Sequence, residues 1–372
     1  MRISVLSTIV TLLLASSGSA LPVQDATRAS AAVNPELPRL VIYFQTTHDS
    51  ATGEPISMLP LITELDIALT HLIVCSFHIN AGSEIHLNDY SPDYPLFATL
   101  WNETLVMKAA GVKVMGMIGG AAPGSFDPDT LDSADAATFE HYYGQLRDVI
   151  VQYGLQGMDL DVEQYMSQAG ITRLVSRLHA DFGDGFIITL APVASALSNQ
   201  GNLSGFDYET LESQAKTADG QDMIDFYNAQ FYSGFGTMSS PLSYERVIRN
   251  GWDPRDIVAG QLTNPSNGGG FTDTASLNTT VAALTAEYGT IGGIMGWEYF
   301  NSVPGGTAEP WRWAQDMTEI LRPGYSVQLT VTSDTAEALD AAWRESVNGG
   351  GSGTSSFAEV TPSVDYFAMV NA

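Results

Sequence analysis

Three acidic residues, Asp159, Asp161 and Glu163, alternate with apolar residues in the segment GMDLDVE at positions 157–163. On a β-strand, alternate side chains share a face, so the three carboxyl groups would point one way and the apolar residues the other. Successive acids would stand about 6–7 Å apart. Burying unpaired carboxylates destabilises a fold unless protons, hydrogen bonds or a metal compensate. Such a segment is therefore typical of residues that are used for chemistry.

The spacing of these acids also predicts their protonation. Like charges on one face raise at least one pKa, so one acid stays protonated near neutral pH. Glu163 ends the segment and would lie nearest a ligand, so we expect it to be the proton donor. Asp159 and Asp161 are expected to titrate as a pair.

A metal site and a solvated acidic face are the alternative interpretations of the acidic segment. The segment lacks the glycine and spacing of an EF-hand loop, and a strand cannot wrap an ion. The six histidines are scattered without ligand spacing. Met158, Leu160 and Val162 alternate with the acids, so the strand is expected to be buried on both faces, which argues against a solvated acidic face. We expect neither a metal nor a cofactor.

Eight β-rich segments separated by roughly 25–40 residues indicate repeated strand–helix units and a parallel sheet. They lie at 39–45, 71–78, 112–118, 155–162, 186–192, 224–232, 257–262 and 291–297. Between the third and fourth segments, Ser133 can cap a helix that Gly154 ends. The apolar face of this helix comprises Phe139, Tyr142, Leu146, Val149, Ile150 and Tyr153.

This pattern predicts an α/β fold, the (β/α)8 TIM barrel, whose strands end at a mouth that carries the active site. An open doubly wound sheet is the alternative, but no Gly-rich phosphate loop follows the first strand. The acids of 157–163 would climb the barrel interior toward the mouth.

The chain ends differ in composition from the barrel. Residues 1–20 have the charge, apolar stretch and small-residue site of a signal peptide, so we expect a secreted, extracellular protein. A membrane anchor would need a longer apolar run. Residues 21–37 resemble a linker or pro-segment, 38–325 form the expected barrel, and 326–372 form a C-terminal extension.

The overall composition bounds the partners. Lys and Arg total 15 against 42 Asp and Glu, a net charge of −27, which disfavours nucleic acid and membrane surfaces. Cys75 is the only cysteine, so no intrachain disulfide can form, and its apolar surroundings predict an inert buried residue. Asn102, Asn202 and Asn278 begin sequons for N-glycosylation. We expect a monomer.

The acidic segment resembles the DxDxE motif of glycoside hydrolase family 18, the chitinases and endo-β-N-acetylglucosaminidases. The resemblance covers about 39–322 and extends to the segments YFQTTHDS, VMGMIGGAAPGSF, GMDLDVEQ, NAQFYSGFG and GIMGWEYFNS. These segments are similar to the secreted fungal endo-β-N-acetylglucosaminidases of the Endo T type. The resemblance implies a glycan or glycoprotein substrate.

The resemblance also implies roles for the acids. Family members use the substrate's own 2-acetamido oxygen as nucleophile. Glu163 would protonate the leaving oxygen and then act as base on water. Asp161 would orient the acetamido N–H, and Asp159 would share a proton with Asp161.

The same resemblance implies a set of substrate-binding residues. Tyr232 would donate to the acetamide oxygen, and strand alternation places Asn228 and Gln230 on its face. Trp297 would be a stacking platform, and Tyr43 would complete the pocket wall. From the residues alone, Tyr232 and Trp297 could equally be core aromatics.

Two departures from the family pattern stand out. The SxGG motif survives only as Gly119 and Gly120, which would still let the backbone and a bound sugar approach closely. Met117 stands in place of the serine, so the support of Asp159 by that serine is left open. Gln156 replaces an aspartate that is frequent at the start of the motif.

The favoured activity is cleavage of the chitobiose core of high-mannose N-glycans. A chitinase shares every residue argued above. A lectin-like barrel without catalysis is the alternative of another class, and the intact Glu163, Asp161 and Asp159 disfavour it.

Overall fold

The computed structural model describes residues 37–324 and residue 337. The predicted signal peptide at 1–20 lies outside these residues, as does almost all of the predicted linker at 21–37 and of the predicted extension at 326–372. Within the described part of the chain, none of the helices is long and apolar enough to cross a membrane.

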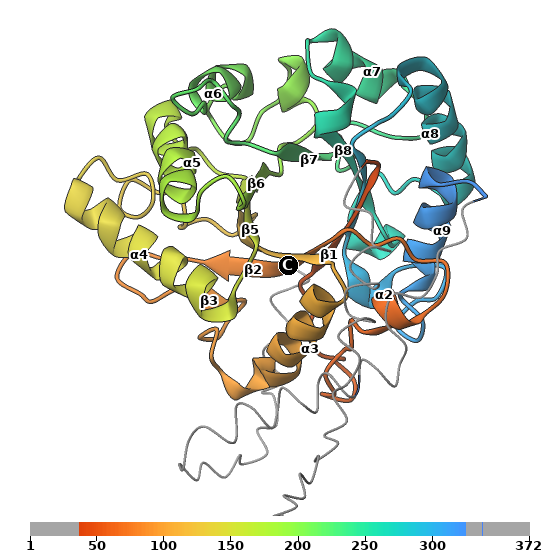
Figure 1. The fold of residues 1–372 in the computed structure, drawn as a ribbon, viewed down its shortest axis with the longest axis horizontal. Helices are drawn as coiled ribbons and strands as arrows, with labels where there is room; N and C mark the ends of the chain where they lie inside the picture. Colours follow the sequence, from red (N-terminus) through yellow and green to blue (C-terminus); the bar gives the residue numbers. More distant parts are fainter. Residues whose placement is uncertain (1–36, 325–336, 338–372) are drawn as a thin grey trace, which may run out of the picture.

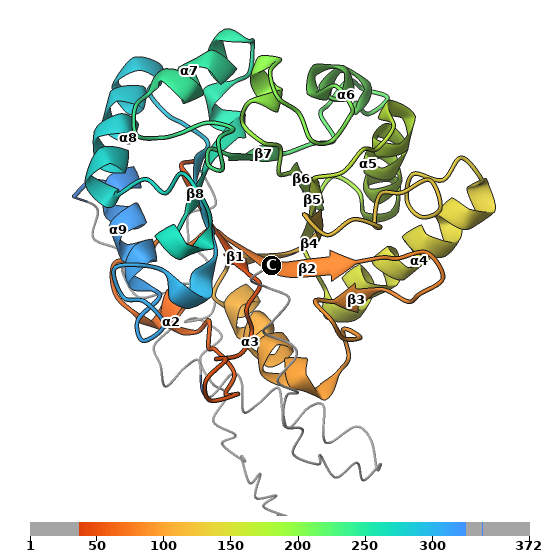
Figure 2. The same cartoon turned by 180° about the vertical axis from the view of Figure 1, so that it is seen from behind.

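The fold is a closed barrel of eight parallel strands with helices around it, which confirms the predicted (β/α)8 architecture (Figures 1 and 2). Neighbouring strands follow the order β1-β9-β8-β7-β6-β5-β4-β2, and pairing of β1 with β2 closes the ring. The barrel strands are β1 (Arg39–Phe44), β2 (His71–His78), β4 (Lys113–Gly120), β5 (Gly157–Val162), β6 (Ile187–Leu190), β7 (Phe226–Gln230), β8 (Ile257–Leu262) and β9 (Gly293–Trp297).

The surrounding helices follow the strands along the chain (Figure 1). They are α2 (Pro60–Thr63), α3 (Ala98–Ala109), α4 (Ala136–Tyr153), α5 (Gln168–Phe182), α6 (Tyr208–Gln214), α7 (Leu242–Arg249), α8 (Thr274–Tyr288) and α9 (Arg312–Leu321). Short 3-10 turns lie at Pro95–Phe97, Ala196–Ser198, Pro254–Asp256, Pro265–Asn267 and Tyr299–Asn301. All eight predicted strand segments are confirmed, although β6 and β7 are shorter than expected. The sequence analysis missed β3 (His86–Leu87), which pairs antiparallel with β2.

Strand alternation divides the apolar side chains into two cores. One fills the barrel and comprises Val41, Tyr43, Ile73, Cys75, Met115, Met117, Phe226, Tyr232, Val258, Leu262 and Met295. The other lies between the strands and the helices, and includes Met158, Leu160 and Val162. Residues two apart on a strand share a face, so a single register places one set inside and the other outside. Cys75 is fully buried, as predicted.

The helix α4 confirms its predicted apolar face but not its predicted start. Phe139, Leu146 and Ile150 are buried, and Gly154 ends the helix with φ +57°. The N-cap is Asp135, not Ser133: its carboxylate accepts from the Thr138 backbone N–H at 2.8 Å. Asp and Ser are comparable N-cap residues, and the carboxylate of Asp135 also meets the positive end of the helix dipole.

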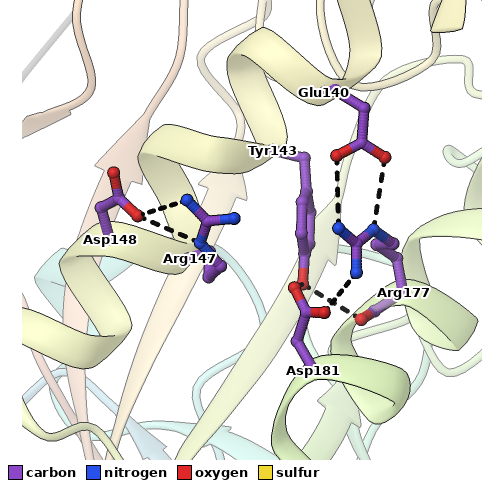
Figure 3. Close-up of polar contacts among 6 residues, drawn as sticks. All are labelled: Glu140, Tyr143, Arg147, Asp148, Arg177 and Asp181. Carbon is purple, nitrogen blue, oxygen red and sulfur yellow. Dashed lines mark hydrogen bonds and ion pairs between the residues drawn. The ribbon is translucent and has the colours of Figure 1, made fainter.

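A polar network joins α4 to α5, the helices that precede and follow β5 in the chain (Figure 3). Arg177 of α5 contacts both carboxylate oxygens of Glu140 at 3.3 Å and pairs with Asp181. Its guanidinium lies 4.9 Å from the centre of the Tyr143 ring, and the Tyr143 hydroxyl donates to Asp181 at 2.9 Å. The two helices that flank β5 in the chain are thereby tied together.

Candidate active site

The three acids of the alternating segment lie on β5 and just after its C-terminal end. Asp159 has no exposed surface, Asp161 is 5% exposed, and Glu163 is half-buried. All three face the barrel axis, because their hydrogen bonds come from other strands of the ring. The predicted inward file of carboxyl groups is confirmed.

Asp159 is held by three donors from three different strands. The Tyr43 hydroxyl of β1 donates to Oδ2 at 2.7 Å, and the Thr189 hydroxyl of β6 donates to Oδ1 at 2.5 Å. The Asn228 side-chain amide of β7 donates to Oδ1 at 3.1 Å. Burial raises the pKa of Asp159, and the three hydrogen bonds oppose that rise. These donors provide the support that the missing serine of β4 left open.

Asp161 and Glu163 are joined through Gln230. The side-chain amide nitrogen of Gln230 lies 3.1 Å from an oxygen of each acid and 3.0 Å from the Ala191 carbonyl. Burial, then the charge of Glu163, then that of Asp159 raise the pKa of Asp161 well above its usual range. We expected Asp161 to titrate mainly with Asp159. In the structure the charge of Glu163 raises the pKa of Asp161 more than the charge of Asp159 does.

Gly119 and Gly120 allow β4 to approach the catalytic strand closely. A Cβ at Gly119 would lie 2.2 Å from the Asp161 backbone oxygen and 2.5 Å from the Phe126 ring, and its φ is +106°. A Cβ at Gly120 would lie 3.8 Å from the Asp161 carboxylate. Only glycine fits at 119, so the conformational role predicted for these glycines is confirmed at this position.

The predicted substrate-binding residues lie at two levels of the barrel, one near its mouth and one in its interior. Tyr232 is 8% exposed and packs with the barrel core, and burial raises its pKa well above the usual range. Trp297 ends β9, is half-buried, and meets the Tyr43 ring edge-on with 5.6 Å between centroids. Both stand near the mouth, where the resemblance put them.

Tyr43 and Asn228 lie deeper than expected. Tyr43 is 1% exposed and Asn228 is fully buried. Both donate to Asp159, so the Tyr43 hydroxyl is used inside the barrel, and a role for the Tyr43 ring in the pocket wall stays a prediction. The predicted shared face of Asn228 and Gln230 is confirmed, but both contact the carboxylates.

Sequence reasoning missed two polar residues of this region. Thr189 is paired in register with Asp159. Its only signal in the sequence is that it is a polar residue within the apolar segment FIITLAP. Glu298 is 4% exposed, and its carboxylate accepts from the backbone N–H groups of Gln45 and Thr46 at 3.1 and 2.7 Å. Burial raises the pKa of Glu298. This acid ties the chain after β1 to the chain after β9.

A cavity of about 280 Å³ has none of the three acids in its lining. The loops after β6 and β7 and the helix α7 line it with Ala194, Ser195, Ser198, Gln200, Gly234, Phe235, Gly236, Thr237, Ser243 and Arg246. The Ala194 N–H donates to the Gln230 carbonyl at 3.0 Å, and the Phe235 N–H donates to the Tyr232 carbonyl at 3.0 Å. Two residues of the cavity lining are therefore hydrogen-bonded to the backbone of Gln230 and Tyr232.

The arrangement supports acid–base chemistry at a bond held over the mouth. Glu163 is accessible there, and a buried acid with a raised pKa stands directly beneath it. Among residues 37–324 and 337, no group of three or more His, Cys, Asp or Glu side chains is placed to hold a metal ion.

Comparisons with known proteins agree with this site. Residues 39–266 match the family model of Glycosyl hydrolases family 18. The chain is 66% identical to a fungal endo-β-N-acetylglucosaminidase from glycosyl hydrolase family 18, over 78% of this chain and all of that one, with a TM-score of 0.75. It is 46% identical to the chitinase ChiC from Aspergillus fumigatus, over 75% of this chain and 98% of that one, with a TM-score of 0.67.

A more distant relative is Chitinase 1 of Rhizopus niveus, which is 26% identical over 219 residues. That match covers 54% of this chain but only 40% of the length of the relative. With the family match and the close structural relatives taken together, the chain belongs to glycosyl hydrolase family 18 and is a glycosidase that acts on glycans.

Proposed function

We propose that this glycosidase is an endo-β-N-acetylglucosaminidase that cleaves the GlcNAc-β1,4-GlcNAc core of high-mannose N-glycans. The observation that carries the proposal is the 66% identity to a fungal endo-β-N-acetylglucosaminidase, which extends over all of that chain. The donor set around Asp159 and Asp161 is consistent with it, because two neighbouring acids in different hydrogen-bond environments can take different roles.

In the proposed reaction, Glu163 gives its proton to the leaving glycosidic oxygen as the C1–O bond breaks. The 2-acetamido oxygen forms a bond to C1, and the positive charge spreads over an oxazolinium ring. Glu163, now ionised, then removes a proton from a water that bonds to C1 and opens the ring. The net change is addition of one water across the glycosidic bond.

Asp161 orients the acetamido N–H and stabilises the charge on the ring. Asp159 stays ionised because three hydrogen-bond donors stabilise its carboxylate. Its negative charge disfavours ionisation of Asp161 until the positively charged oxazolinium ring forms. Tyr232 donates to the acetamide oxygen, and Trp297 supports the sugar face. Gly120 leaves space beside the Asp161 carboxylate.

The test is mass analysis of the products from one high-mannose glycoprotein. The proposal expects the protein to keep a single N-acetylglucosamine and the released glycan to end in the other one. Release of the intact glycan or no reaction, together with digestion of chitin oligomers, would overturn the assignment.

Chitin hydrolysis is the second candidate, and the 46% identity to a chitinase favours it. The carboxylates serve both substrates, so the relative kcat/KM on the glycoprotein and on chitin oligomers decides between them.

We also propose that the chain is secreted and carries N-glycans. The signal-like segment at 1–20 motivates the first statement. The three sequons motivate the second: Asn202 and Asn278 are exposed, and Asn102 on α3 is half-buried. Culture-medium fractionation and mass mapping of the three asparagines in a eukaryotic host test both statements.

A further inference from the structure

An exposed aromatic ring stands at the mouth directly beyond the catalytic acid. Tyr165 is two residues after Glu163, and 68% of its surface is exposed. It is the most exposed of the large apolar side chains in the described part of the chain. An isolated exposed tyrosine needs no explanation, but this one stands at the site of bond cleavage.

The ring is held in place from behind. Gly205, in the loop between β6 and α6, has φ +81°, and a Cβ there would lie 2.4 Å from a ring carbon of Tyr165. The ring therefore lies against bare backbone. The Met166 N–H donates to the Ser204 carbonyl at 2.8 Å, which joins the two chain segments next to this contact.

The chain before Tyr165 is fixed as well. The Gln164 side chain accepts from the Gly124 N–H at 2.8 Å and donates to Asp127 at 2.6 Å. Both partners lie in the loop after β4. Tyr165 is thus carried by a segment anchored on both sides, so its ring is presented to solvent at low entropic cost.

The order of the strands around the barrel indicates which part of a substrate would contact the Tyr165 ring. Trp297 ends β9, and Glu163 follows β5, which is four strands away from β9 in either direction around the ring of eight. A sugar resting on Trp297 reaches Glu163 across the mouth. The leaving group begins where Glu163 delivers its proton, so it extends past Glu163 toward the rim of β5 and β6.

We propose that the Tyr165 ring is the stacking platform for the first saccharide of the leaving group, the pyranose that stays with the aglycone. A sugar ring presents a face of C–H groups that packs on an aromatic face, while its hydroxyls stay in water. The acidic chain does not repel this neutral unit. The inference rests on the proposed glycoprotein activity and names the contact that would recognise the retained N-acetylglucosamine.

The experiment compares a substrate that has a leaving sugar with one that has none. The first is a glycopeptide with a high-mannose N-glycan. The second is the preformed oxazoline of the same glycan, whose hydrolysis needs Glu163 but no leaving group. The variants are Tyr165→Ala, Tyr165→Phe and Tyr165→Trp, with Val151→Ala on α4 as a control that trims an equally exposed side chain away from the mouth.

Tyr165→Ala should lower kcat/KM for the glycopeptide roughly three- to tenfold, the equivalent of one lost aromatic contact. Its oxazoline hydrolysis should stay within about twofold of the unchanged protein, since that step uses only the other side of the site. Tyr165→Phe and Tyr165→Trp should keep glycopeptide cleavage, because the ring and not the hydroxyl makes the contact.

Unchanged glycopeptide cleavage by Tyr165→Ala would overturn the platform. So would equal loss on both substrates, which would mean that Tyr165 only supports Glu163. A chitin tetramer is assayed with every variant. The unchanged enzyme could cleave the chitin tetramer and not the glycopeptide, with Tyr165→Ala the only variant that loses activity on the tetramer. That result would support the stacking role of Tyr165 and overturn the proposed glycoprotein specificity.

Discussion

Two neighbouring carboxylates on one strand meet different hydrogen-bond environments in this barrel. Asp159 receives donors from Tyr43, Thr189 and Asn228, whereas Asp161 receives one from Gln230, which it shares with Glu163. Donors stabilise the ionised form, so the charge rests more easily on Asp159 and the proton on Asp161. This difference lets side chains of identical chemistry take different roles in the proposed mechanism.

Glu163→Gln should abolish hydrolysis, with kcat reduced by at least about 10²- to 10⁴-fold, the range expected for loss of a general acid–base group. The amide keeps the shape and the contact with Gln230 but cannot supply the proton. Rates on a glycopeptide and on chitin oligomers measure the effect, and an unchanged melting temperature shows that the fold is intact. Substantial remaining turnover would refute the assignment.

Asp161→Asn should separate the two halves of the reaction. The amide cannot balance the positive charge of a forming ring, so glycopeptide cleavage should fall about 10²-fold or more. A preformed oxazoline has already passed that step and should still be hydrolysed at a measurable rate. Single-turnover assays on both substrates measure the split, and equal loss on both would contradict the role given to Asp161.

At the scale of elements, β4 and the helix pair α4–α5 position the catalytic strand. β4 approaches β5 so closely at Gly119 that the two backbones leave no space for a Cβ. On the outer side, the network around Arg177 ties together the helices that precede and follow β5 (Figure 3). The position of the acids thus depends on the close approach of β4, whereas the network between the helices contributes to stability.

Gly119→Ala should reduce both stability and activity. The new Cβ meets the Asp161 backbone oxygen, so about 1–3 kcal/mol of overpacking adds to about 1 kcal/mol of strain at positive φ. Gly183→Ala is the matched control, since Gly183 has φ +74° but nothing within 4 Å of its Cβ position. Gly119→Ala should lower both the free energy of unfolding in urea and kcat, whereas Gly183→Ala should lower only the free energy of unfolding. Equal effects would mean that the close approach is unimportant.

Arg177→Met should lower the free energy of unfolding by about 1 kcal/mol, because a partly exposed network loses both its ion pairs and its contact with Tyr143. Arg147→Met is the control: Arg147 pairs only with its exposed neighbour Asp148, and its loss should have no measurable effect. Chemical denaturation measures both variants. Activity should be unchanged in each, and a larger loss for Arg147→Met would contradict the network.

The whole molecule combines buried acids with a strongly acidic composition. Burial raises the pKa values of Asp159, Asp161 and Glu298, and the chain carries a net charge of −27. A carboxyl group with a raised pKa binds its proton more tightly in the folded state. Its contribution to stability is complete below the unfolded pKa of about 4 and is lost as the pH rises through the folded pKa. Repulsion among the acids acts in the same direction.

The melting temperature should therefore be highest near about pH 4–5 and should fall toward pH 8. At still lower pH, the exposed N-cap carboxylates of Asp135 and Asp273, whose pKa values are lowered by backbone hydrogen bonds, lose their contribution. Asp161→Asn should flatten the decline above pH 5, because it removes one of the raised groups. A melting temperature that rises steadily to pH 8 in a thermal-shift series would disprove this balance.

The sequence by itself determined the features that depend on local period. The two-residue period of a β-strand puts Asp159, Asp161 and Glu163 on one face, and this holds whichever strands lie beside it. The same rule separates Met158 and Leu160 into the outer core. The repeated strand and helix patterns then indicate a parallel sheet with both faces buried, and the missing Gly-rich loop after the first strand favours the barrel over an open doubly wound sheet.

Only the tertiary structure decided which side chains meet the acids. Tyr43 and Asp159 are 116 residues apart, and Gln230 and Asp161 are 69 apart, so their contacts depend on how the strands are staggered when the barrel closes. Stagger is a property of the whole ring, and no local period encodes it. For the same reason the sequence could not reveal that Thr189 and the Tyr43 hydroxyl meet Asp159, or that Gly205 lies behind the Tyr165 ring.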